Sequence, residues 1–448
     1  MNPNIFKAYD VRGLYPAELD EQGFHQIGRA FVAYLAAKRI GVGRDMRLSS
    51  PSLTAAFIAG AREQGAEVID YGMIATDMIY YAVATDQLDG GAQITASHNP
   101  KQYNGCKMVG RGNHPLSGDA GISDIRDMIA SGRVPAPTTA GGLTQRTILD
   151  GYVKHVLGFI DPSIVKPFRV VLDAGCGMAG LSAPELFKAL PCNVDALCFT
   201  IDGTFPTHEA NPLIEENRRD IVDRVKALRA EIGIAWDGDA DRCFFIDEDG
   251  EFIPGDFVTA LLAEAFLLKE PGATIVYDLR ASYAVKDVAA KYGGTAVMNR
   301  VGHAFFKGRM RELNAVFGGE VTGHYYFRDN FYCDNGVIPA LLILELMSKK
   351  QQSLKQLLEP LRAKYFISGE INTRIPSMDA MAARMAAIEA RYPDGAISRL
   401  DGVSIEYPDW HFNVRSSNTE PLLRLNLEGT TFEQMERKRD EVLAIIRG

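Results

Sequence analysis

Short apolar runs alternate with segments of helical periodicity over most of this 448-residue chain. In its first third, the spacing of apolar residues predicts helices at 23–38, 53–64 and 78–84 and strands at 46–48 and 67–69. Alternation of this kind usually builds an α/β unit with a largely parallel sheet, which binds ligands at the carboxyl ends of its strands. The sequence therefore predicts an N-terminal α/β domain.

Two further blocks show the same alternation. Their predicted elements are strands at 168–172, 194–200, 232–236, 274–277 and 295–298 and helices at 181–190, 217–229, 255–269 and 283–291. The three blocks are expected to share one architecture, although no residue-level repeat proves a duplication. Residues 133–147, rich in Pro, Thr, Gly and Ala without apolar periodicity, predict a linker after the first block.

The pattern changes from about residue 363. Strands are expected at 365–375, 403–407, 410–414 and 422–427, and helices at 378–391 and 432–446, which predicts a smaller α+β domain. The expected fold is three similar α/β domains with mixed sheets plus a small α+β C-terminal domain. The expected domain limits are residues 1–148, 149–253, 254–364 and 365–448.

Composition excludes several classes of protein. With 46% hydrophobic and 23% charged residues the chain is globular, and a net charge of −9 argues against a nucleic-acid binder. The six cysteines include no C-x-x-C pair and are read as reduced thiols. The longest apolar runs, at 260–268 and 337–347, are interrupted by charged residues or proline, so no membrane span is expected. Without a signal-peptide pattern, a cytoplasmic location is expected.

The strongest chemical signal is the run Asp237-Gly238-Asp239-Ala240-Asp241-Arg242, which lies between the apolar runs 232–236 and 243–246. Three carboxylates so close together repel one another unless a cation is bound. Mg²⁺ prefers oxygen ligands, typically a few carboxylates with phosphate and water. A solvated acidic turn is the alternative, but the apolar strands on both sides favour a metal site.

A calcium EF-hand loop is a second reading of the aspartate run. Glu248 falls at position twelve of such a loop. Arg242, however, stands where the EF-hand needs glycine for its sharp turn, and the flanking segments are predicted as strands, not helices. The EF-hand is therefore rejected.

A glycine-rich turn suggests a different function. Residues Gly175-Cys176-Gly177-Met178-Ala179-Gly180 follow a predicted strand and open a helix, as the G-x-G-x-x-G dinucleotide motif does. Asp195 and Asp202 lie at plausible distances for a ribose contact. Glycines at such a turn can also simply permit tight packing, with no role in binding a dinucleotide. An NAD-linked oxidoreductase is therefore the alternative function.

Several polar loops complete the candidate set. Thr95-Ala96-Ser97-His98-Asn99-Pro100 follows a short apolar run, and its Asn-Pro step predicts a turn with Ser97 exposed at a strand tip. Arg415-Ser416-Ser417-Asn418-Thr419-Glu420-Pro421 offers an arginine, hydroxyls and amides to a phosphate, or is a solvated hairpin. The turns 300–303 and 319–324 could bond sugar hydroxyls, or hold ordinary loop histidines.

Taken in order, Phe6-Lys7-Ala8-Tyr9-Asp10-Val11-Arg12-Gly13, the Ser97 loop, the aspartate run and the Arg415 loop resemble the alpha-D-phosphohexomutase superfamily. The chain is most similar to its bacterial phosphomannomutase/phosphoglucomutase branch, because phosphoglucosamine mutases usually carry Gly in place of Asn418. The resemblance implies four domains around a central cleft, and a monomer or weak homodimer. A phosphoglucosamine mutase and a non-enzymatic sugar-phosphate sensor are the remaining alternatives.

The resemblance also implies a reaction and a set of site residues. Hexose 1-phosphate and hexose 6-phosphate would interconvert through a phosphoserine and a hexose 1,6-bisphosphate. Ser97 would carry the phosphoryl group, and Asp237, Asp239 and Asp241 would hold Mg²⁺ with a phosphoserine oxygen. Glu320 and Thr322 would contact sugar hydroxyls, and Arg415, Ser417, Asn418 and Thr419 would bind the phosphate that is not transferred. Tyr9, Arg12, Lys107, Arg242, His303 and His324 match positions lining the cleft, and Arg12, Lys107 and His324 are candidates for proton transfer.

Three positions depart from the pattern of this branch. Thr322 replaces the commoner serine, Val321 stands where methionine is frequent, and Cys176 replaces a common asparagine. These differences concern the sugar preference and leave the expected chemistry unchanged.

Overall fold

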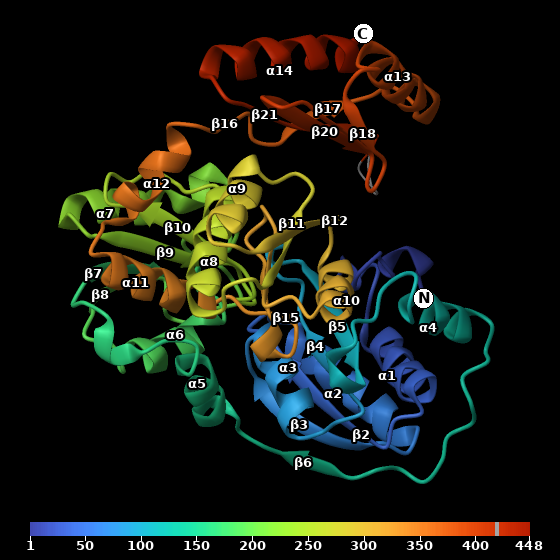
Figure 1. Ribbon diagram of the computed structural model, residues 1–448. Helices are drawn as coiled ribbons and strands as arrows, with labels where there is room; N and C mark the ends of the chain where they lie inside the picture. The colour runs from blue at the N-terminus through green and yellow to red at the C-terminus, as the bar shows by residue number, and fades with distance from the viewer. Residues whose placement is uncertain (417–420) are drawn as a thin grey trace. The chain divides into compact units, whose positions relative to one another are not determined.

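The computed structural model of the chain describes residues 1–416 and 421–448 (Figure 1). Its contacts divide the chain into two compact units. The first unit comprises residues 1–253, 302–317 and 322–354, and the second comprises residues 254–301, 318–321 and 355–448. The Ser97 loop and the aspartate run both belong to the first unit.

The N-terminal α/β domain is a mixed six-stranded sheet in the order β1-β5-β4-β2-β3-β6. Its elements are β1 (Val11–Leu14), α1 (Glu21–Leu35), β2 (Arg39–Arg44), α2 (Ser50–Glu63), β3 (Glu67–Met73), α3 (Thr76–Thr85), β4 (Gly90–Ile94), β5 (Tyr103–Gly110), α4 (Ile122–Ala130) and β6 (Leu143–Gln145). Strands β4, β2, β3 and β6 run parallel, whereas β5 pairs antiparallel with both β1 and β4. The Ser97 loop therefore leaves the carboxyl end of a central strand.

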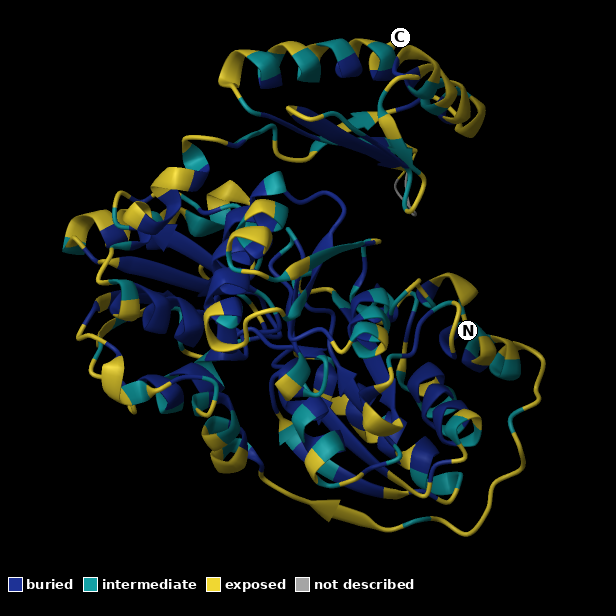
Figure 2. Ribbon diagram, in the orientation of Figure 1, coloured by how far each residue is buried: buried dark blue, intermediate teal, exposed yellow. Residues whose placement is uncertain are grey.

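The predicted strand at 46–48 is wrong. The strand is β2, and residues 46–48 form the turn that leads from β2 into α2. Two glycines in β2, Gly41 and Gly43, weaken the strand pattern, because glycine has low β propensity. The linker expected at 133–147 is a largely exposed extended segment that contains the short strand β6 (Figure 2).

The second α/β domain is a four-stranded sheet in the order β10-β9-β7-β8. Its elements are α5 (Leu149–Leu157), β7 (Arg169–Asp173), α6 (Ala179–Phe187), β8 (Asn193–Leu197), α7 (Arg219–Leu228), β9 (Ile232–Trp236) and β10 (Cys243–Asp247). Every residue of β9 and β10 is buried, and the two strands form an antiparallel hairpin (Figure 2). The aspartate run is the turn of this hairpin, as the flanking apolar runs predict.

The elements of the third α/β domain are divided between the two units. The second unit holds α8 (Gly255–Lys269), α9 (Tyr283–Lys291) and the parallel pair β11 (Thr274–Asp278) and β12 (Thr295–Asn299). The first unit holds α10 (His303–Leu313), α11 (Ile338–Lys350) and the antiparallel pair β14 (Tyr325–Phe327) and β15 (Cys333–Asp334). The chain passes between the units within β13 (Phe317–Gly319) and again at the start of α12 (Leu354–Arg362).

The C-terminal domain packs two helices on a sheet. Its elements are β16 (Phe366–Ile367), β17 (Ile371–Arg374), α13 (Met378–Arg391), β18 (Ala396–Ser398), β19 (Val403–Glu406), β20 (Trp410–Ser416), β21 (Leu422–Gly429) and α14 (Phe432–Arg447). The single strand expected at 365–375 is two strands, separated by a turn in which Gly369 has a φ of +66°. The predicted fold class, three α/β domains and a small C-terminal α+β domain, is confirmed.

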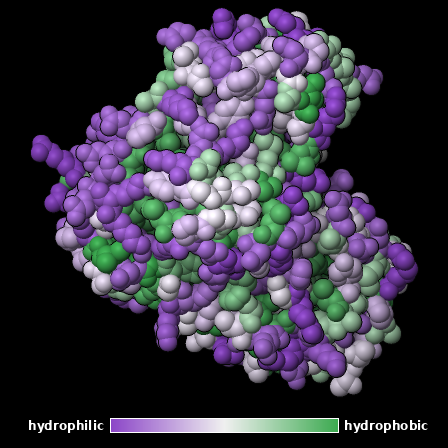
Figure 3. Space-filling view, in the orientation of Figure 1, coloured by the Kyte–Doolittle hydropathy of each residue, from purple (hydrophilic) through white to green (hydrophobic). Residues whose placement is uncertain are grey.

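The outer surface is mixed in character. The face in Figure 3 is mostly hydrophilic, with small scattered hydrophobic areas. Among the described residues, no helix has the length and apolar character needed to cross a membrane.

Candidate functional site

Ser97 lies three residues after β4, in a left-handed backbone conformation with a φ of +50°. The predicted exposure of Ser97 is wrong, because only 1% of the residue is accessible. Its hydroxyl donates a hydrogen bond to Asp237 Oδ2 at 3.0 Å and lies 3.1 Å from His98 Nδ1. The serine of the first domain and the aspartate run of the second therefore meet in one place.

Arg47 explains the burial of Ser97. This guanidinium is fully buried and donates hydrogen bonds to the carbonyls of Ser97 at 2.8 Å and Asn99 at 2.6 Å. Its other contacts are the carbonyls of Pro100 at 2.8 Å and Tyr103 at 3.0 Å and the Asp45 carboxylate at 3.1 Å. Backbone carbonyls that leave water need partners, and Arg47 supplies them for this loop. No sequence pattern predicts this role for Arg47, since an isolated arginine in a turn carries no signal of it.

Besides Ser97, two side chains of the first domain reach the aspartate turn, those of Thr76 and Lys107. Thr76 Oγ1 donates to Asp239 Oδ2 at 2.5 Å, and Lys107 Nζ donates to the same oxygen at 2.7 Å. Lys107 also donates to Asp241 Oδ2. The three aspartates are almost completely buried, with at most 1% of each accessible. Lys107 therefore neutralises part of a buried negative cluster.

The pKa values of Asp237 and Asp239 are shifted in opposite directions. Burial, followed by repulsion from Asp241 and Asp239, raises the pKa of Asp237 to about 7. Burial also acts to raise the pKa of Asp239, but the Lys107 ammonium outweighs it and lowers the pKa to about 2. A second positive charge beside Asp237 would remove the cost of ionising all three groups.

The aspartate turn fits a hard divalent cation. One oxygen from each of Asp237, Asp239 and Asp241 lies within 4.8 Å of the others. The Oδ1 atoms of Asp239 and Asp241 are buried and have no hydrogen-bond partner among the described residues. Buried carboxylate oxygens without partners are costly, and a cation with oxygen ligands satisfies them.

Basic and imidazole groups surround the same turn. Arg242 Nε donates to His324 Nε2 at 2.9 Å, and the Arg242 amide donates to Asp237 Oδ1 at 3.2 Å. His324 Nδ1 lies 3.2 Å from Asp334 Oδ2. Burial, and then the charge of Arg242, lower the pKa of His98 well below its usual range, so His98 is neutral. Within residues 1–416 and 421–448, no ion pair joins His98 to a carboxylate.

The other predicted residues of this unit are Arg12, Tyr9, His303 and Thr322. Arg12, in β1, donates to Asn99 Oδ1 at 2.6 Å and so reaches the Ser97 loop. The Tyr9 ring packs edge-on against the His303 ring at a centroid distance of 5.5 Å, and the His303 ring lies 6.3 Å from that of His324. Thr322 is half-buried, two residues before His324.

Comparison with known proteins gives one consistent family. Four models of the phosphoglucomutase/phosphomannomutase family match the chain: alpha/beta/alpha domain I at residues 3–134, domain II at 150–250, domain III at 254–365 and the C-terminal domain at 370–445. A phosphomannomutase of Escherichia coli is 42% identical over 453 residues, which covers 99% of each chain. The chain belongs to the phosphoglucomutase/phosphomannomutase family. It is therefore a phosphohexomutase, an enzyme that transfers a phosphoryl group within a hexose phosphate.

Two further relatives of this mutase support the same family assignment. A protein of Xanthomonas campestris pv. campestris strain B100 described as phosphohexose mutases is 42% identical over 446 residues, or 99% of each chain. The crystal structure of a phosphoglucomutase/phosphomannomutase family protein from Burkholderia thailandensis has a TM-score of 0.91 and 34% identity, and covers 100% of this chain and 98% of that one.

The glycine-rich turn of this mutase has a packing role, and the oxidoreductase alternative is not favoured. A Cβ at Gly177 would lie 2.6 Å from the Gly238 carbonyl, and the Met178 amide donates to that carbonyl at 2.9 Å. The glycines thus let the loop after β7 support the aspartate turn. Asp195, which would contact a ribose in the alternative, is instead paired with Arg224 through two hydrogen bonds of 2.8 and 2.7 Å.

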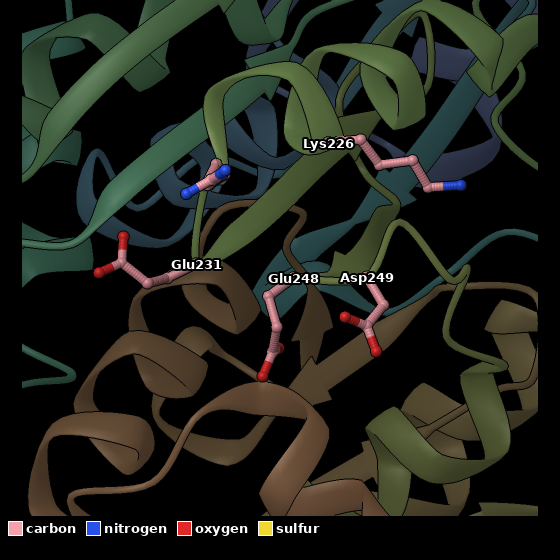
Figure 4. A pocket seen from close by; sticks show the side chains of 6 residues that line it. Lys226, Glu231, Glu248 and Asp249 are labelled. Carbon is pink, nitrogen blue, oxygen red and sulfur yellow. The ribbon is translucent and has the colours of Figure 1, made fainter.

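The structure also agrees with rejection of the EF-hand. Glu248 follows the far end of β10, so β10 separates it from Asp241 by roughly 13 Å of extended chain. Glu248 lines a surface pocket of about 300 Å³ with Asp249, Lys226 and Glu231 (Figure 4). That pocket contains none of the predicted site residues.

Two described residues of the predicted set, Glu320 and Arg415, belong to the second unit. Glu320 is buried, and Arg415, near the end of β20, donates to Glu370 Oε2 at 3.2 Å. Arg280 Nη1 and Arg424 Nη1 contact the same carboxylate at 3.4 and 3.3 Å. The sequence analysis missed Arg280, Arg424 and Glu370. Ser417, Asn418 and Thr419 lie outside the described residues.

Proposed function

We propose that this phosphohexomutase interconverts the 1-phosphates and 6-phosphates of mannose and glucose, with Ser97 as its phosphoryl carrier. The observation that carries the proposal is the 3.0 Å hydrogen bond from the Ser97 hydroxyl to Asp237 inside a buried turn of three aspartates. A hydroxyl held against a cation site can carry a phosphoryl group whose charge the cation offsets. The name phosphomannomutase given to the Escherichia coli relative supports mannose as one of the sugars.

In the forward direction the phosphoryl group passes from Ser97 to O6 of a hexose 1-phosphate. The bond between phosphorus and Ser97 Oγ breaks and a bond to O6 forms, while a base takes the proton of the O6 hydroxyl and the released Ser97 oxygen takes up a proton. The resulting hexose 1,6-bisphosphate turns over and returns its C1 phosphoryl group to Ser97, which leaves hexose 6-phosphate. Added bisphosphate would therefore load an enzyme that had lost its phosphoryl group.

Asp237, Asp239 and Asp241 would hold Mg²⁺, in keeping with their unpartnered buried oxygens. When bound, Mg²⁺ neutralises negative charge on the phosphoryl group. The chain itself adds the positive charges of Arg242 and Lys107, which border the aspartate turn.

His324 is the best placed of the three candidates for proton transfer. The Arg12 guanidinium has donor N–H groups only and no acceptor atom for a proton. The carboxylates of Asp239 and Asp241 raise the pKa of Lys107 against the effect of burial, so Lys107 keeps its proton. His324 has one ring nitrogen 2.9 Å from Arg242 Nε and the other 3.2 Å from Asp334 Oδ2, and an imidazole nitrogen without a hydrogen is a proton acceptor. We infer that His324 accepts the proton of the sugar hydroxyl.

The remaining residues would bind the sugar and its second phosphate. Glu320 and Thr322 would contact sugar hydroxyls, with Tyr9 and His303 beside them. Arg415, Ser417, Asn418 and Thr419 would bind the phosphate that is not being transferred, which the convergence of arginines on Glu370 supports. We also propose the domain limits 1–148, 149–253, 254–364 and 365–448, a cytoplasmic location, and a monomer or weak homodimer.

The sugar preference decides between this proposal and a phosphoglucosamine mutase. Steady-state kcat/KM would be measured with mannose, glucose and glucosamine 1-phosphates, using Mg²⁺ and a trace of the matching bisphosphate. We expect mannose and glucose to be used within about tenfold of each other, since they differ only at C2, and glucosamine far less. A higher kcat/KM for glucosamine 1-phosphate would contradict the proposed substrates. Intact-mass measurement would show whether the purified protein carries one phosphate and loses it on incubation with substrate. Absence of such a phosphate would favour the sensor alternative.

A further inference from the structure

We propose that Asp173, Cys198 and His208 form a second metal site in this protein, which takes a divalent transition metal ion of the zinc class. All three residues belong to the second α/β domain, and none of them takes part in the proposed phosphoryl transfer. One ligand atom from each residue lies within 4.8 Å of the other two. The inference is independent of the proposed function.

The distances match the edges of a tetrahedral site. His208 Nε2 lies 3.1 Å from Asp173 Oδ2 and 3.8 Å from Cys198 Sγ. Around tetrahedral zinc, with Zn–N of about 2.0 Å and Zn–S of about 2.3 Å, neighbouring ligand atoms are about 3.3–3.6 Å apart. The two distances from His208 Nε2 are therefore within a few tenths of an ångström of coordination geometry, and the carboxylate and the sulfur lie within 4.8 Å of each other.

The His208 ring is oriented as a ligand. Its Nδ1 lies 3.0 Å from the backbone carbonyl of Glu209, to which a protonated Nδ1 donates. This contact leaves Nε2 directed at the sulfur and the carboxylate. A histidine that ligates a metal almost always donates its other ring N–H to a carbonyl or carboxylate in this way.

The chemistry of the three donors selects the metal. Thiolate and imidazole favour zinc and its neighbours in the transition series, whereas Mg²⁺ and Ca²⁺ prefer oxygen ligands throughout. The aspartate turn, with three carboxylates, has the opposite preference. The two sites would therefore take different ions from one solution.

Without a metal, this cluster is poorly matched for hydrogen bonding. The single Nε2 position of His208 faces both a carboxylate and a sulfur. A metal ion would bind all three ligand atoms at once.

Backbone geometry fixes the surroundings of this cluster. Cys176 and Cys198 have φ values of +56° and +53°, and the Cys176 amide donates to the Cys198 carbonyl at 2.8 Å. Left-handed backbone is unusual for cysteine and is retained where the surrounding structure requires it. The same loop continues to Gly177, whose Cα approaches the Gly238 carbonyl of the aspartate turn. The second site would therefore brace the loop on which the first site rests.

Cobalt spectroscopy tests the proposal. The full-length protein, stripped with EDTA and kept reduced in excess Mg²⁺, would be titrated with Co²⁺. We expect a thiolate-to-cobalt charge-transfer band in the near ultraviolet that saturates at one equivalent and disappears on addition of one equivalent of Zn²⁺. The aspartate turn cannot produce this band, because it contains no sulfur. Absence of the band in the native protein would overturn the proposal.

Matched variants assign the ligands. Cys198→Ser, His208→Gln and Asp173→Asn should each abolish the band. Asparagine is chosen at position 173 because its Oδ1 can still accept the hydrogen bond that the Gly175 amide donates to Asp173 Oδ1 at 2.9 Å. Cys192→Ser, a half-buried cysteine of the same domain, should leave the band unchanged. Each variant would first be shown to unfold cooperatively without metal. A band retained in Cys198→Ser, or a Cys176–Cys198 disulfide found by peptide mapping in place of metal uptake, would overturn the proposal.

Discussion

The Ser97 hydroxyl donates a 3.0 Å hydrogen bond to the carboxylate of Asp237, a residue 140 positions later in the chain. The bond joins the loop after β4 to the turn between β9 and β10. Both residues are about 1% accessible, so the contact is made out of water. Groups whose pKa is shifted by burial and by specific neighbours cluster at functional sites, which makes this contact a candidate for a catalytic role.

Replacing Ser97 with alanine tests its role as phosphoryl carrier. Without the hydroxyl no phosphoryl group can be stored, so we expect kcat to fall by at least about 10³-fold, as losses of covalent nucleophiles do. Turnover of mannose 1-phosphate would be measured with saturating bisphosphate. Ser163→Ala, an exposed serine of the second domain, serves as the control and should retain full activity. Near-normal turnover by the Ser97 variant would contradict the phosphoserine mechanism.

Replacing Arg47 with methionine tests the buried clamp on the Ser97 loop. The change leaves the Asp45 carboxylate and several loop carbonyls without a cationic partner. We expect a loss of about 3–5 kcal/mol in the free energy of unfolding, measured by urea titration. Arg224→Met is the matched control, because its pair with Asp195 is largely solvent-exposed and should contribute less than about 1 kcal/mol. Equal effects of the two substitutions would show that Arg47 does not hold the loop.

The raised pKa of Asp237 predicts a pH dependence of stability in the absence of divalent metal. Its pKa is about 7 in the folded protein, mainly because of burial, and about 3.9 in the unfolded chain. Between these values the folded state holds a proton that the unfolded state has released. The resulting stabilisation is complete below about pH 4 and is lost as the pH rises through about 7.

The comparison with Asp237→Asn isolates this effect. In EDTA, the free energy of unfolding of the native protein should fall relative to that of the variant between pH 5 and pH 8. Mg²⁺ added at pH 8 should raise the free energy of unfolding of the native protein again, because the cation stabilises the ionised carboxylate. Parallel pH profiles for the two proteins would show that Asp237 does not titrate in this range.

Arg415→Ala tests the phosphate loop of the C-terminal domain. Burial, and then the nearby Arg280, lower the pKa of Arg415, yet the guanidinium stays charged and can pair with a phosphate. We expect the KM for hexose 1-phosphate to rise by at least about tenfold, since a hydrogen bond to a charged group contributes about 1.5–3 kcal/mol. Arg399→Ala, at an exposed pair with Glu389, is the control. An unchanged KM would remove Arg415 from substrate binding.

The sequence by itself determined the elements with clear apolar periodicity and the local chemistry of the aspartate turn. The predicted strand 232–236 coincides with β9, and the predicted helices 255–269 and 283–291 coincide with α8 and α9. These elements have clear apolar periodicity, which depends only on neighbouring residues. The carboxylates of the turn at positions i, i+2 and i+4 likewise need no distant partner to be recognised.

Only the tertiary structure decided which residues surround Ser97. The Asn-Pro turn predicts exposure, but Arg47 binds the loop carbonyls and the β9–β10 turn covers the hydroxyl. The glycine-rich turn gained its packing role in the same way, through the approach of Gly177 to the Gly238 carbonyl. Periodicity reports the burial of a residue's own strand or helix. The contacts at Ser97 join residues 50 to 140 positions apart, and these distances are fixed only when the domains fold and pack.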